Sequence, residues 1–107
     1  MKLFFSDKAI NQLQSLSQFE HICLNDTQYL HISDGQEIDL VLRTNETDFS
    51  AYDDILETHI GQVHVRENAL KFLGHDNRID FDDFRQAFVL IVDGHVMNDD
   101  IYLQKAS

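Results

Sequence analysis

The side chains best suited to holding a metal lie near the middle of the chain. Glu57, His59 and His64 belong to the segment ETHIGQVH, whose residues alternate as in a strand hairpin. If residues 60–61 form a two-residue turn, His59 faces Gln62 across the hairpin. Glu57 then faces His64, and all four side chains project from one face. Two imidazoles and a carboxylate could hold zinc or ferrous iron, which accept nitrogen and oxygen donors. The alternative is that the valines pack inward and the polar face only meets water.

Cys23 is the only cysteine of the chain, so no internal disulfide can form. Several thiolates usually hold one iron-sulfur cluster. A chain with one cysteine could therefore bind a cluster only as a multimer or with ligands from elsewhere. The flanking Ile22 and Leu24 leave a second interpretation open, in which Cys23 is a small buried hydrophobe within a strand.

The acidic stretch LGHDNRIDFDDFRQAF, residues 73–88, resembles a calcium-binding loop at first sight. An EF-hand needs side-chain oxygens at the first and third positions of its loop. Placing Ile79 at the apolar position of that loop puts Phe72 first and Gly74 third, and neither offers an oxygen. The EF-hand is therefore excluded. The aspartates within 80–83 could supply paired carboxylates for acid–base chemistry. Their alternation also predicts a solvated sheet edge that discourages strand pairing.

Motifs of the common enzyme classes are absent from the sequence. It contains no glycine-rich loop that could cradle a phosphate, no glycine-flanked nucleophilic serine and no histidine helix of a zinc hydrolase. No catalytic residue can be named on this basis, and we expect a protein that is not an enzyme.

Composition predicts one soluble domain over residues 1–107, with 43% hydrophobic residues for a modest core. Nineteen acidic and eight basic side chains give a net charge of -11, which repels phosphate backbones and anionic lipid surfaces. No apolar stretch has the length of a membrane helix or a signal segment. We expect a cytoplasmic protein that binds neither nucleic acid nor membranes. A protein partner, and a monomeric or homodimeric state, stay open.

Helical periodicity is confined to two segments. Ser6 is the expected N-cap of the amphipathic segment SDKAINQLQSLSQF, which places Ile10, Leu13 and Leu16 on one face. A second, shorter helix is expected over residues 67–73, because this segment has high helix propensity and ends at a glycine. The chain therefore has one substantial helix and one short one.

The rest of the chain alternates with period two, which predicts about seven or eight short strands. They are expected at residues 1–5, 21–25, 29–33, 37–44, 55–60, 62–66, 78–81 and 84–92. Turns are expected at Asp34–Gly35 and Asp93–Gly94, and the aperiodic segment NETDFSAYDD is expected to be a loop. A mainly β, β-rich α+β domain follows, with two sheets packed as a β sandwich.

The aromatic residues near the C-terminus are expected to be part of the core. Large apolar side chains recur through residues 81–92, in the two strands predicted there. We expect these side chains to line the hydrophobic core rather than a ligand-binding slot. They are Phe81, Phe84, Phe88, Leu90 and Val92.

Several short motifs follow one another in a fixed order. The helical turn Ala69–Leu73 leads to Arg78–Phe81 and then to the aromatic strand Ala87–Leu90. This order resembles the C-terminal half of the HesB/IscA-like, or A-type, iron-sulfur cluster biosynthesis family, whose pattern there reads SLxFL, xLDF and xFxF. The upstream DILETHIGQVHVRENAL and the opening LFFSDKAINQLQSL are similar to the family's hairpin and to its first strand and helix. The resemblance therefore spans nearly the whole chain.

This resemblance implies a compact β-rich fold and, in the carrier members, assembly or carriage of iron-sulfur clusters or iron. Carriers bind metal through one cysteine in the loop after the first central strand and a Cys-Gly-Cys pair near the C-terminus. Here the pair would fall at about Asp99 and Ile101, and Cys23 precedes the loop of the first ligand. The chain resembles a cysteine-poor branch that lacks the usual ligands.

Two functions follow from these expectations. The first is a non-enzymatic accessory protein related to iron-sulfur cluster assembly, without a cysteine-ligated cluster. The second is a HesB-like scaffold reused as a protein-interaction module with no metal. Iron, an iron-sulfur cluster or zinc are the cofactors to consider, beside none at all. The candidate ligands are Cys23, Glu57, His59 and His64.

Overall fold

A computed structural model of the chain describes residues 1–16, 19–26 and 40–106. These residues form strands and helices in the order β1 (Lys2–Phe5), α1 (Asp7–Ser15), β2 (Cys23–Asp26), β3 (Leu40–Thr44), β4 (Asp54–Thr58), β5 (Gly61–Val65), α2 (Glu67–Leu70), β6 (Asp76–Asp82), β7 (Ala87–Val92) and β8 (His95–Lys105). The predicted strand at 29–33 and the predicted turn at Asp34–Gly35 lie outside the described residues. The turn at Asp93–Gly94 is confirmed, with both residues at positive φ.

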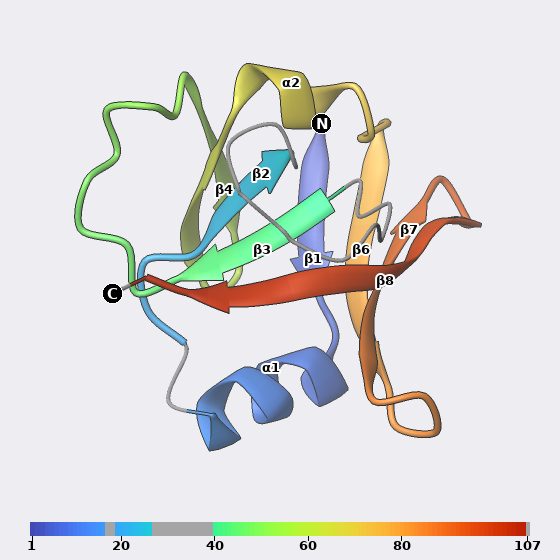
Figure 1. Cartoon of the computed structure of the whole chain (residues 1–107). Coiled ribbons are helices and arrows are strands. Elements are labelled where there is room, and N and C mark those ends of the chain that lie inside the picture. The colour runs from blue at the N-terminus through green and yellow to red at the C-terminus, as the bar shows by residue number, and fades with distance from the viewer. Residues whose placement is uncertain (17–18, 27–39, 107) are drawn as a thin grey trace, which may run out of the picture.

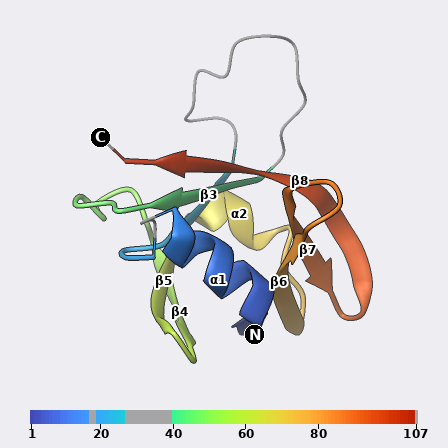
Figure 2. The same ribbon diagram turned by 90° about the horizontal axis from the view of Figure 1, so that it is seen from below.

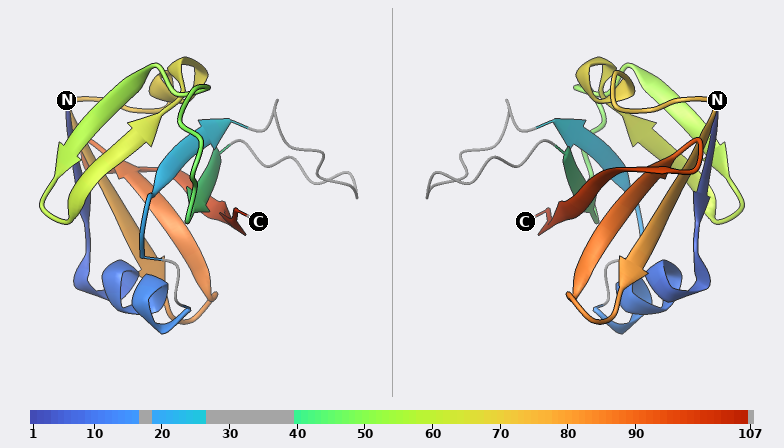
Figure 3. Two further views of the ribbon diagram at one scale, coloured as in Figure 1. Left: turned by 90° about the vertical axis from the view of Figure 1, so that its left-hand side faces the viewer. Right: turned by 90° about the vertical axis from the view of Figure 1, so that its right-hand side faces the viewer.

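The strands form one eight-stranded sheet in the order β1-β6-β7-β8-β3-β2-β5-β4. Its two end strands, β1 and β4, lie next to each other, so the sheet curls into a nearly closed barrel (Figures 1 and 3). The expected two-sheet sandwich is therefore wrong. Period-two alternation indicates only that one face of each strand is buried. One face is buried both in two facing sheets and in a single curled sheet, so the pattern does not distinguish them.

The two helices lie at opposite ends of the barrel (Figure 1). Seen from below, the strands are arranged around α1, which covers that end (Figure 2). Ser6 is its N-cap, as predicted, and its hydroxyl accepts a hydrogen bond from the amide of Ala9 at 3.1 Å. Leu13 is fully buried, whereas Leu16 lies past the last helical residue and is half-exposed. No helix in the described ranges is long and apolar enough to cross a membrane.

The core fills the inside of the barrel with alternate side chains from its strands. Its members from the sheet include Leu3, Phe5, Leu24, Leu42, Val63, Val65, Ile79, Phe81, Phe88, Leu90, Val92 and Ile101. Four of the five aromatic and aliphatic residues expected there are thus confirmed. Phe84 is the exception, because its side chain is 97% exposed. Strand β7 begins only at residue 87, and Phe84 lies in the turn before it.

The aspartates within residues 80–83 were expected at a solvated strand edge, and the pairing of β6 shows where they lie. Strand β6 lies between β1 and β7, and its pairing with β1 ends where Phe5 meets Ile79. The aspartates come after that point, at the end of β6 nearest α1. Among the described residues, Asp80 and Asp82 are therefore paired with β7 only, and the side of β6 that β1 occupies further back is free of a strand here.

Candidate functional site

Three neighbouring strands carry polar side chains on the outer face of the barrel. In the sheet, β2 lies between β3 and β5. Cys23 of β2 is paired with Arg43 of β3 and with His64 of β5. Residues paired in this way point to the same side of a sheet. The next residue of β2, Leu24, points to the opposite side and into the core. Cys23 and His64, two of the four predicted ligands, are therefore neighbours.

The segment between β3 and β4 covers this face. The Phe49 ring stacks on the His64 ring, with 4.0 Å between ring centroids and 21° between planes. Tyr52 packs edge-on against both rings, with centroid distances of 6.4 Å. An ion pair between Glu46 and Arg43 fastens the beginning of the segment to β3. Cys23 is consequently fully buried although it lies outside the barrel core.

The chemistry of this face follows from its burial. Burial raises the pKa of the Cys23 thiol to about 11, and the nearby Tyr52 hydroxyl opposes that rise only in part. Burial likewise raises the pKa of Tyr52 to about 12. The thiol therefore carries its proton at neutral pH and lies 3.7 Å from the backbone oxygen of His21, as a hydrogen-bond donor. A protonated, covered thiol is a poor nucleophile and a poor metal ligand.

Two cavities flank the covering segment. One, of about 500 Å³, lies between Phe49, His64 and the segment that leads into β2. The other, of about 330 Å³, is lined mainly by polar groups that include Arg43, Tyr52 and Arg66. Cys23 lines neither of them.

The predicted metal site in the hairpin of β4 and β5 rests on the wrong register. Thr58 pairs with Gly61, so the turn consists of His59 and Ile60. Gly61 has a φ of 122° and is the first residue of β5. The turn lies one residue earlier than predicted, so each residue of β4 faces a different residue of β5 than expected.

The shifted register separates the three hairpin ligands. Glu57 faces Gln62 and accepts a hydrogen bond from its side-chain amide at 2.8 Å. His59 stacks on Phe4 of β1 at 4.3 Å, whereas His64 lies under the segment that follows β3. Over residues 1–16, 19–26 and 40–106, no three His, Cys, Asp or Glu side chains are grouped closely enough to hold a metal ion.

Sequence comparison places the chain in a family. The family model described as iron-sulphur cluster biosynthesis matches residues 1–105. The chain belongs to the iron-sulphur cluster biosynthesis family. This confirms the resemblance seen in the motifs of its C-terminal half. No curated protein matches the chain.

Two solved structures share the fold of this iron-sulphur cluster biosynthesis family member. A candidate Fe-S biosynthesis protein from Lactobacillus acidophilus has a TM-score of 0.76 and 12% identity, over 98% of this chain and 90% of that one. A second, from Lactobacillus salivarius, has a TM-score of 0.73 and 12% identity, over 98% of each chain. At this identity the likeness concerns the fold alone.

The positions where the family resemblance implies a cysteine pair hold unsuitable residues. Asp99 is exposed, and its carboxylate forms an ion pair with Arg85 at 3.0 Å. Ile101 is 3% exposed and belongs to the core. With Cys23 buried and protonated, the residues present do not fit a cluster held by thiolates.

Sequence reasoning missed the residues that cover Cys23. Phe49 and Tyr52 lie in a segment that was correctly predicted to be a loop, because its residues lack periodicity. Their one signal in the sequence is that two aromatic rings occur within an otherwise polar loop. Large rings in a loop favour packing against the domain over exposure to water.

Proposed function

We propose that the protein is a non-enzymatic accessory factor of cytoplasmic iron-sulfur cluster assembly that carries no cluster on thiolates of its own. Membership of the iron-sulphur cluster biosynthesis family supports the link to cluster assembly. The observation that carries the rest is the state of Cys23, the only thiol of the chain, which is buried and has a pKa raised to about 11. Iron-sulfur clusters need several thiolates, and this chain supplies none at neutral pH.

Anaerobic reconstitution with iron and sulfide tests this proposal. The wild-type protein and the variant Cys23→Ala are incubated, desalted, and compared by visible absorbance and by iron content. We expect both to be colourless with far less than one iron per chain. A brown wild-type protein whose visible absorbance disappears in Cys23→Ala would overturn the proposal. The far-ultraviolet circular dichroism of both proteins controls for folding.

A second candidate function is a protein-interaction module of the same fold with no metal. It is favoured by large apolar side chains that lie exposed on the β6–β8 part of the sheet, of which Phe84, Val96 and Met97 are the most exposed. A cluster-assembly reaction on a separate scaffold protein distinguishes the two candidates. An accessory factor changes the rate of cluster formation when added in stoichiometric amount, whereas a module without this role leaves the rate unchanged.

A further inference from the structure

The turn between β6 and β7 exposes an aromatic ring almost completely. The Phe84 side chain is 97% exposed, more than any other large apolar side chain of the described residues. A phenyl ring in water does not gain the free energy that burial of its apolar surface would provide. Aromatic side chains are enriched at the centres of protein interfaces, so an exposed ring on an ordered turn is suited to bury itself in a partner protein.

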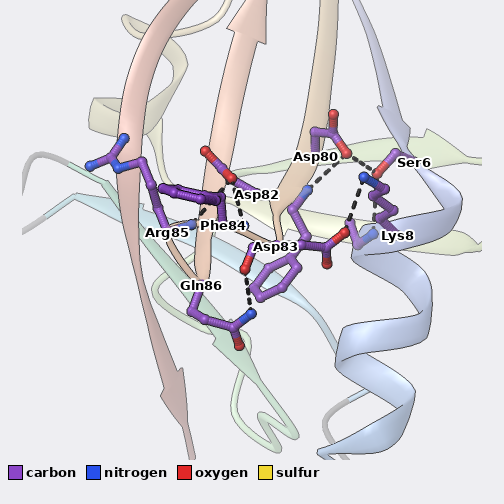
Figure 4. Close-up of polar contacts among 10 residues, drawn as sticks. Ser6, Lys8, Asp80, Asp82, Asp83, Phe84, Arg85 and Gln86 are labelled. Carbon is purple, nitrogen blue, oxygen red and sulfur yellow. Dashed lines mark hydrogen bonds and ion pairs between the residues drawn. The ribbon is translucent and has the colours of Figure 1, made fainter.

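Hydrogen bonds hold this turn in one shape (Figure 4). The Asp82 carboxylate accepts from the amides of Phe84 and Arg85 at 3.0 and 3.2 Å. The Gln86 side-chain amide donates to the carbonyl of Asp83 at 2.6 Å. A turn that is ordered before binding loses little conformational entropy when a partner binds.

Arg85 fastens the same turn to strand β8. Its guanidinium donates to the backbone carbonyl of Asp99 at 3.2 Å and pairs with the carboxylate of the same residue at 3.0 Å. Because Arg85 is used in this way, its charge is offset locally. The Phe84 ring therefore projects from a turn that is anchored to β8.

The surroundings of Phe84 are acidic. Next to the ring lies a cavity of about 440 Å³ whose lining includes the carboxylates of Asp80, Asp82 and Asp83 and the ammonium of Lys8. Lys8 is paired with Asp83 at 3.1 Å, so this cation already has a partner (Figure 4). The three aspartates leave the cavity with an excess of negative charge, within a chain of net charge -11. Basic side chains complement this surface, and acidic ones are repelled.

We propose that the β6–β7 turn is a docking surface for a basic segment of a partner protein. The Phe84 ring enters an apolar pocket of the partner, and lysine or arginine side chains of the partner lie against the aspartates beside it. A second copy of this chain fits less well, since its acidic surface meets like charge. This inference goes beyond the proposed function. It requires no metal, and it can fail while the reconstitution result stands.

Selection from a phage-displayed library of random dodecapeptides tests the docking surface, with the folded full-length chain as the immobilised target. We expect enriched peptides to be basic and to contain a large apolar residue. Their affinity, measured by calorimetry, should fall roughly tenfold or more in Phe84→Ser, as for a buried aromatic anchor. It should also fall with rising ionic strength. Ile55→Ser is the matched control, because Ile55 is 51% exposed on β4, a strand that pairs with neither β6 nor β7. Its affinity should stay within about twofold of wild type.

Two outcomes would overturn the proposal. One is a failure to enrich any peptide above a selection on the empty support, or equal affinity of the peptides for wild type and Phe84→Ser. The other is concentration-dependent self-association of the wild type in analytical ultracentrifugation that Phe84→Ser abolishes, which would assign the turn to a second copy of the chain. Phe84→Ser should unfold at the wild-type temperature, because an exposed ring contributes little to folding.

Discussion

Cys23 and His64 are register partners in the parallel ladder of β2 and β5, on the outer face of the barrel. Phe49 stacks on the imidazole of His64, and Tyr52 lies beside the thiol. A thiol and an imidazole this close could form a reactive or metal-binding pair. Here the aromatic cover removes the thiol from water and raises its pKa to about 11, which disfavours the thiolate at neutral pH.

The first prediction is a loss of stability in alkali. In the folded protein burial raises the pKa of Cys23 from 9.0 to about 11 and that of Tyr52 from 10.0 to about 12. The unfolded chain loses these protons at lower pH. Between about pH 9 and about pH 12 it binds fewer protons than the folded chain, and the free energy of unfolding falls as pH rises.

Urea midpoints across that range measure the loss, which should be on the order of 1 kcal/mol or more for Cys23. In the variant Cys23→Ala, the free energy of unfolding should decrease less between about pH 9 and about pH 11, where the thiol titrates in the wild type. An identical pH dependence of wild type and variant would contradict a buried, protonated thiol.

A second prediction concerns the hydroxyl of Ser6, which links α1 to β6. It accepts from the amide of Ala9 at 3.1 Å and donates to the Asp80 carboxylate at 2.6 Å. Ser6→Ala should reduce the free energy of unfolding by about 1–2 kcal/mol, because it removes both the cap and the link. Ser15→Ala is the matched control. The hydroxyl of Ser15 makes an exposed bond to the carbonyl of Gln12, and its loss should cost less than about 0.5 kcal/mol.

The third prediction concerns how the contribution of the Ser6–Asp80 hydrogen bond to stability depends on pH. Partial burial acts to raise the pKa of Asp80, but hydrogen bonds from Ser6 and from the Phe81 amide, with nearby positive charges, outweigh it and lower the pKa. A lowered pKa stabilises the fold above the ordinary aspartate value and loses this effect as pH falls below it. The free energies of unfolding of wild type and Asp80→Asn, measured with urea, should differ at neutral pH, and the difference should shrink as pH falls below the ordinary aspartate pKa. A constant difference would refute the link.

The fourth prediction concerns Asn77, a buried amide that joins β1 to the segment before β6. Its Nδ2 donates to the carbonyls of Lys2 and Gly74 at 2.8 and 3.0 Å, and its Oδ1 accepts from the Gly74 amide at 2.8 Å. Asn77→Ala removes all three of these buried hydrogen bonds and should cost about 2–3 kcal/mol in urea unfolding. Asn98→Ala, which removes one exposed bond to the Asp100 amide, should cost less than about 1 kcal/mol. Equal costs would show that the buried amide is dispensable.

A fifth prediction tests the hairpin as a zinc site. Glu57 is bonded to Gln62, and His59 and His64 stack on different aromatic rings, so the three side chains do not converge. Calorimetric titration with zinc should therefore give the same weak isotherm for wild type and for His59→Ala combined with His64→Ala. Saturation at one zinc per chain that this double variant abolishes would show that the side chains converge on a metal in solution.

Features that depend only on residues close together in the chain could be predicted from the sequence. The N-cap Ser6 and the turn Asp93–Gly94 are local, because a hydroxyl reaches an amide three residues on and glycine tolerates a positive φ. The spacing of the motifs from Ala69 to Leu90 was enough to indicate the family. The count of one cysteine, read from the sequence, already placed a thiolate-held cluster in doubt.

Contacts between residues that are distant in the chain could not be predicted in this way. The predicted alternation of strands is the same for a sandwich and a barrel, and closure depends on β1 reaching β4. The alternating pattern does not say whether the hairpin turn consists of residues 59–60 or 60–61. The structure has the turn at 59–60, and this register separates His59 from His64. Phe84 fits the spacing of the core aromatic residues. Strand β6 nevertheless ends at Asp82, whose carboxylate accepts a hydrogen bond from the amide of Phe84 and forms the turn. Burial of Cys23 required two rings from a loop that is distant in sequence, and no periodicity encodes such a contact.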